Sequence, residues 1–89
     1  MRDLEYAYKI LGINSIAIER NLNGKRRSEE EKLLFLKERK EHKIHILKNK
    51  IQLIGISEET IKKCMKEINL VENAYNELVN SIKTNELGL

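Results

Sequence analysis

The sequence contains no proline and no tryptophan, and only four glycines in 89 residues. So few helix-breaking residues favour long, uninterrupted helices. The single cysteine, Cys64, excludes an internal disulfide and suits a reducing cytoplasm. No apolar run approaches the roughly 18 residues that a membrane-spanning helix needs, and no signal peptide is recognisable. We therefore expect a cytoplasmic chain with no membrane-spanning segment.

What the chain does contain is charge and aliphatic side chains. Charged residues make up 35% of it, most of them Lys and Glu, and Ile and Leu dominate the apolar residues. Eighty-nine residues form one small domain with a single modest core. Together with the lack of breakers, this composition predicts an all-α fold over residues 1–89.

The strongest signal is the spacing of apolar residues between Ser57 and Ile82. They recur every three or four positions, which at about 100° per residue places them on one side of an α-helix. Ser57 can accept a hydrogen bond from a free amide of the first turn, and Glu58 and Glu59 suit the positive end of the helix dipole. We predict a helix over residues 58–82, with Cys64 buried on its apolar side as a structural thiol.

A second long helix is predicted over residues 29–54. Ser28 and Glu31 form a capping box at its start, and Gly55 stops it. The very short link to residues 58–82 makes the two helices antiparallel neighbours.

The N-terminal part is less regular. Residues 3–11 show one helical face and end at Gly12, which suits a left-handed closing residue. For residues 14–24 we predict a loop with room for one helical turn capped by Ser15. The short helix 3–11 is expected to pack across the hairpin, and residues 83–89 are expected to fray. The predicted core comprises Leu4, Tyr8, Leu11, Leu33, Leu36, Leu47, Ile51, Ile61, Ile68, Val71, Tyr75 and Leu78.

The positive charge is concentrated in the middle of the chain. Residues 25–50 hold ten Lys or Arg against five Glu, a balance of +5, whereas the rest has a balance of −2. Four of these residues form a basic stripe on the predicted second helix: Lys32, Arg39, Lys43 and Lys50. A basic cluster precedes that helix: Lys25, Arg26 and Arg27. These seven are the candidate partner-binding residues, although a solvated face with (i, i+4) Glu–Lys pairs explains the stripe equally well.

Two stretches, in this order, resemble the J-domain of DnaJ-type co-chaperones. Residues 6–13, Tyr-Ala-Tyr-Lys-Ile-Leu-Gly-Ile, look like that family's opening helix with its Tyr-x-Ile-Leu-Gly-Ile close. Residues 72–78, Glu-Asn-Ala-Tyr-Asn-Glu-Leu, look like its third helix, where an Ala-Tyr pair and a Leu face the core. The resemblance implies a short helix against an antiparallel pair, and a positive second helix that meets a DnaK-type chaperone.

The family's signature His-Pro-Asp tripeptide is missing. The family spacing, counted back from Ala74-Tyr75, lands near Leu53-Ile54-Gly55, which is apolar, and the chain has no proline. Because the tripeptide triggers ATP hydrolysis by the partner chaperone, the resemblance implies a J-like scaffold without the trigger.

Other site chemistry finds little support in the sequence. His42 and His45 are three residues apart, but two weak ligands among lysines make a poor metal site, so we predict no metal. No Gly-rich phosphate loop and no nucleophilic triad is visible, and we expect neither an enzyme nor a cofactor. The alternative to a protein partner is a nucleic acid bound by the basic stripe and residues 25–27, although one Phe and three Tyr offer few stacking groups.

Overall fold

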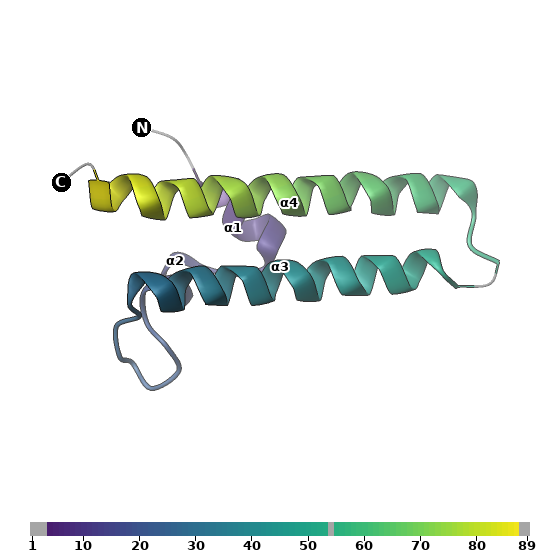
Figure 1. The fold of residues 1–89 in the computed structure, drawn as a ribbon. Helices are drawn as coiled ribbons and strands as arrows, with labels where there is room; N and C mark the ends of the chain where they lie inside the picture. The colour runs from purple at the N-terminus through teal and green to yellow at the C-terminus, as the bar shows by residue number, and fades with distance from the viewer. Residues whose placement is uncertain (1–3, 54, 88–89) are drawn as a thin grey trace.

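The computed structural model of the chain describes residues 4–53 and 55–87. Within these residues it is all-α, with one isolated β-bridge between Arg20 and Arg26 and no strand. The described helices are α1 (Glu5–Leu11), α2 (Ser15–Glu19), α3 (Glu29–Ile51) and α4 (Glu58–Leu87). Helices α3 and α4 run antiparallel, α1 packs mainly on α4, and α2 lies near the start of α3 (Figure 1). The predicted all-α fold built on a helical hairpin is confirmed.

The predicted start and stop signals work as expected at three helix ends. The hydroxyl of Ser28 accepts a hydrogen bond from the Glu31 amide, and the Glu31 carboxylate accepts one from the Ser28 amide. At the start of α4, the hydroxyl of Ser57 accepts a bond from the amide of Thr60. Gly12 closes α1 in the left-handed conformation, with φ of 70°. These local interactions fix where the helices begin and end.

Two predicted boundaries were wrong. Helix α3 ends at Ile51 rather than at residue 54, because the amides of Gln52 and Leu53 bond back only three residues in a tightened last turn. Helix α4 continues to Leu87, so residues 83–87 are helical and not frayed. Adding one more residue to an existing helix requires no new nucleation, which favours this extension. Residues 3, 54, 88 and 89 of the predicted segments lie outside the described residues.

Helix α2 is the single helical turn for which the predicted loop over residues 14–24 left room. Its cap is Asn14 rather than Ser15: the Asn14 side chain accepts a hydrogen bond from the amide of Ala17. Ile18 is buried in the core and holds this single turn in place. A five-residue helix is too short to be stable alone, so tertiary packing stabilises it.

The core lies between α1, α3 and α4. Of the predicted core residues, five are buried: Leu11, Leu36, Leu47, Val71 and Leu78. The others are only partly buried: Leu4, Tyr8, Leu33, Ile51, Ile61, Ile68 and Tyr75. Two residues outside the predicted core list, Ala7 and Ala74, are fully buried on helices that pack together, where small side chains allow close approach. Cys64 is buried with a free thiol, as predicted.

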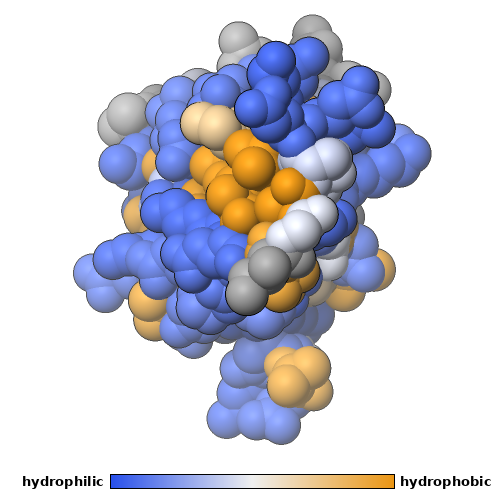
Figure 2. Space-filling view, turned by 90° about the vertical axis from the view of Figure 1, so that its right-hand side faces the viewer, coloured by the Kyte–Doolittle hydropathy of each residue, from blue (hydrophilic) through white to orange (hydrophobic). Residues whose placement is uncertain are grey.

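Helix α1 covers only part of the hairpin. It lies against the middle of the α3–α4 pair, and no described helix covers the end where α3 turns into α4 (Figure 1). Seen onto that end, apolar surface gathers in the centre of a hydrophilic rim (Figure 2). Apolar side chains next to the turn that keep some exposure are Ile51, Leu53, Ile56 and Ile61. The hairpin therefore has a covered half and an open half.

Candidate partner-binding surface

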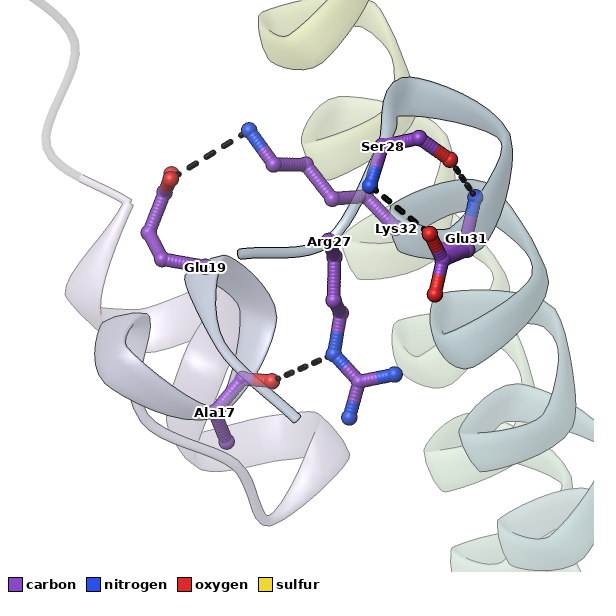
Figure 3. A network of polar contacts seen from close by, with 6 residues as sticks. All are labelled: Ala17, Glu19, Arg27, Ser28, Glu31 and Lys32. Carbon is purple, nitrogen blue, oxygen red and sulfur yellow. Dashed lines mark hydrogen bonds and ion pairs between the residues drawn. The ribbon is translucent and has the colours of Figure 1, made fainter. Parts of the chain in front are cut away.

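The basic stripe of α3 is divided between internal contacts and solvent. Lys32, at its N-terminal end, reaches across to α2, where its Nζ lies 3.3 Å from a carboxylate oxygen of Glu19 (Figure 3). The Lys32 side chain is largely covered, whereas the Glu19 carboxylate is exposed. A partly exposed ion pair of this kind contributes only about 0.2–1 kcal/mol to folding stability, but it orients the Lys32 side chain toward α2.

Arg39 is turned inward. Its Nη2 donates to the carbonyls of Leu11 and Gly12, each at 3.3 Å, at the C-terminal end of α1. These carbonyls lack partners within their own helix, and a cation there also faces the negative end of the helix dipole. The Nε of Arg39 is buried and finds no hydrogen-bond partner among the described residues. Arg39 therefore fastens α1 to α3.

The other two members of the stripe remain available to a partner. Lys43 is half-buried: its Cε and Nζ both lie next to Gly12, and the residue also lines an open groove. Lys50, two turns further along α3, is exposed. The part of the stripe that can meet a macromolecule is thus its C-terminal half, nearer the hairpin turn.

The basic cluster before α3 is divided in the same way. The guanidinium of Arg27 lies over the ring of Phe35, 4.3 Å from its centroid, and its Nε donates to the Ala17 carbonyl at 3.0 Å (Figure 3). Arg27 therefore joins α2 to α3. Lys25 and Arg26 stay exposed, in a turn closed by the left-handed Gly24.

A groove opens beside Lys43, on the uncovered half of the hairpin. Its volume is about 350 Å³ and its lining is largely aliphatic. The lining residues are Ile10, Lys43, Ile46, Leu47, Glu67, Leu70 and Val71. Helical periodicity hints at this surface, because it places Ile46 outside the apolar face of α3 that packs in the core. Leu70, likewise outside the apolar side predicted for α4, was missed.

His42, His45 and Tyr8 are the remaining titratable side chains of interest. His42 and His45 are exposed on α3, and among the described residues no group of three or more His, Cys, Asp or Glu lies close enough to hold a metal. Burial, and secondarily the negative charge of Glu19, raise the pKa of the Tyr8 phenol above its usual value.

Comparisons with protein families, with characterised proteins and with solved structures give no significant match to this chain. No helix in the described part of the chain is both long and apolar enough to cross a membrane.

Proposed function

We propose that this chain is a non-enzymatic protein-interaction module with a J-like scaffold, a degenerate co-chaperone that binds its partner without stimulating ATP hydrolysis. The supporting observation is the packing of a short helix, closed by Gly12, against an antiparallel pair in which Ala74 is buried and Tyr75 packs on the core. This is the arrangement that the resemblance of residues 6–13 and 72–78 to J-domains implies. The buried free thiol of Cys64 is compatible with a reducing cytoplasm, where we propose the module works.

The proposed partner is an acidic protein surface, such as that of a DnaK-type chaperone, and the proposed contact residues are Lys43 and Lys50. Lys32, Arg39 and Arg27 contribute indirectly, because their cationic groups already bind elements of this chain. Attraction between exposed charges is screened by salt, so binding should weaken as ionic strength rises.

The experiment measures binding of the purified chain to a DnaK-type chaperone with ATP and with ADP, together with single-turnover ATP hydrolysis. We expect binding that is lost in the double variant Lys43→Glu, Lys50→Glu. The matched control is Lys37→Glu, Lys48→Glu, which changes the same charge at two exposed positions of α3 away from the stripe. The hydrolysis rate should stay at its basal value, because the chain has no His-Pro-Asp tripeptide.

Three outcomes contradict the proposal. A clear stimulation of hydrolysis would mean that the chain activates the chaperone without a His-Pro-Asp tripeptide. Equal loss of binding in both double variants would mean that only net charge matters. Direct binding of duplex DNA or structured RNA at physiological salt, lost in the variant Lys25→Glu, Arg26→Glu, would instead assign the chain to the nucleic-acid-binding class.

A further inference from the structure

The groove on the open half of the hairpin adjoins the proposed chaperone contact at Lys43 and adds an apolar surface to it. Two of its aliphatic side chains are about half exposed, Ile46 at 50% and Leu70 at 49%. They come from different helices and line the same hollow together with the buried Leu47 and Val71. Apolar side chains that converge on one open hollow are typical of a recognition surface rather than of scattered surface exposure.

The shape of the groove is set by the helix that ends beside it. Helix α1 lies against the hairpin, and its residue Ile10 forms one wall of the groove. Beyond α1, the α3–α4 pair continues toward its turn with no described helix covering it (Figure 1). From Lys43 to Leu53, α3 and its last turn extend about 15 Å at the helical rise per residue, which is room for two to three turns of another helix. The covered half of the hairpin already accepts such an element.

The positive charge around the groove favours an acidic helix as its occupant. Residues 43–67, which form this half of the hairpin, hold six Lys and three Glu, a balance of +3. Lys43 lies at the groove itself, and helical periodicity places Lys50 one turn from Ile46 and Lys63 one turn from Glu67. Glu67 is the acidic residue of the lining. A second copy of this chain would bring the same positive half against it, which like-charge repulsion disfavours.

We propose that the groove bounded by Ile10, Ile46 and Leu70 binds an amphipathic helix of a partner protein, with aliphatic residues on one face and acidic residues along its edges. The aliphatic face enters the groove in the manner of helix-in-groove recognition, and its acidic edges meet Lys43, Lys50 and Lys63. This site shares Lys43 and Lys50 with the proposed chaperone contact, but its aliphatic walls, Ile10, Ile46 and Leu70, play no part in that contact and carry the inference by themselves.

The probe is a fluorescent peptide of about 14 residues, long enough to form a helix when bound, with Leu at i, i+3, i+4 and i+7 and with Ala and Glu elsewhere. A second peptide replaces every Glu by Lys. We expect saturable binding of the Glu peptide in fluorescence anisotropy, with a dissociation constant at least about tenfold lower than that of the Lys peptide. Ile46→Glu and Leu70→Glu should each weaken binding of the Glu peptide by about tenfold or more.

The matched controls are Leu34→Glu on α3 and Met65→Glu on α4. These side chains are equally exposed, at 55% and 57%, but they do not line the groove. Glu67→Lys should instead raise the affinity for the Glu peptide several-fold, because it replaces the negative charge of the lining by a positive one. A gain of this kind cannot result from unfolding.

The proposal is overturned if the wild-type chain shows no saturable binding of the Glu peptide, or binds the Lys peptide equally well. It also fails if the control substitutions weaken binding as much as those in the groove, or if Glu67→Lys leaves the affinity unchanged. Sedimentation that reveals a dimer disrupted by Leu70→Glu would assign the groove to a second copy, and displacement of the peptide by duplex DNA would assign it to nucleic acid.

Discussion

Replacing Arg39 by Met should destabilise the whole domain, although Arg39 belongs to a stripe that the sequence presents as a binding surface. The substitution keeps an apolar stem of similar length but removes both hydrogen bonds to the Leu11 and Gly12 carbonyls. A hydrogen bond to a charged group contributes about 1.5–3 kcal/mol. At 3.3 Å both bonds are longer than strong charge-assisted ones, and Met also removes the buried Nε that has no described partner. We therefore expect a net loss of about 1–2 kcal/mol.

For a domain of this size, that loss corresponds to a fall in melting temperature of roughly 4–16 °C. Circular dichroism at 222 nm during thermal and urea unfolding measures it. Lys50→Met is the control, since this exposed residue of the same stripe should change stability by less than about 0.5 kcal/mol. Arg39→Lys should recover only part of the loss, because an ammonium lacks the planar fork of a guanidinium. Equal stability of Arg39→Met and wild type would refute the role of Arg39 as a fastener of α1.

Two further predictions concern the core and its pH dependence. Leu78→Ala should lower the free energy of unfolding by about 2–5 kcal/mol in urea titrations, whereas Leu34→Ala, at an exposed position, should lower it by less than about 1 kcal/mol; similar losses for both would contradict the burial of Leu78. Because the pKa of Tyr8 is raised in the folded state, its contribution to stability is fully present below the unfolded value of 10.0 and is lost as pH rises from there through the folded pKa. Urea midpoints measured between about pH 8 and 11 should show this decline, and Tyr8→Phe should remove that component; an unchanged decline in the variant would rule Tyr8 out as its source.

The sequence was sufficient for the architecture because the long helices carry local signals. The capping box at Ser28 and Glu31 and the apolar spacing of residues 58–82 are both properties of neighbouring residues. The end of α3 could not be predicted as well, since the amides of Gln52 and Leu53 bond back only three residues, and apolar spacing does not signal such a change. For α2, the sequence allowed one helical turn but pointed to Ser15 as its cap, whereas the cap is Asn14 and the burial of Ile18 by distant residues holds the turn in place.

The candidate surface was harder to predict than the fold. Helical periodicity placed four basic residues on one side of a single helix, and all four do lie in α3: Lys32, Arg39, Lys43 and Lys50. It could not reveal that α1 and α2 come to lie beside the first half of that stripe, because Leu11 and Gly12 are 28 and 27 residues from Arg39 in sequence. The groove was missed in the same way, since it is lined by three separate helices.

The docking of α1 on α4 has a consequence for how the chain is made. Tyr6 donates a hydrogen bond to the carboxylate of Glu77, a residue 71 positions later in the chain. During translation at about 5–20 residues per second, α1 therefore waits for several seconds before its main packing partner has left the ribosome. Seven residues do not hold a helix alone, so α1 stays largely unstructured in the nascent chain. The α3–α4 hairpin, whose contacts are closer in sequence, can form before α1 closes onto it.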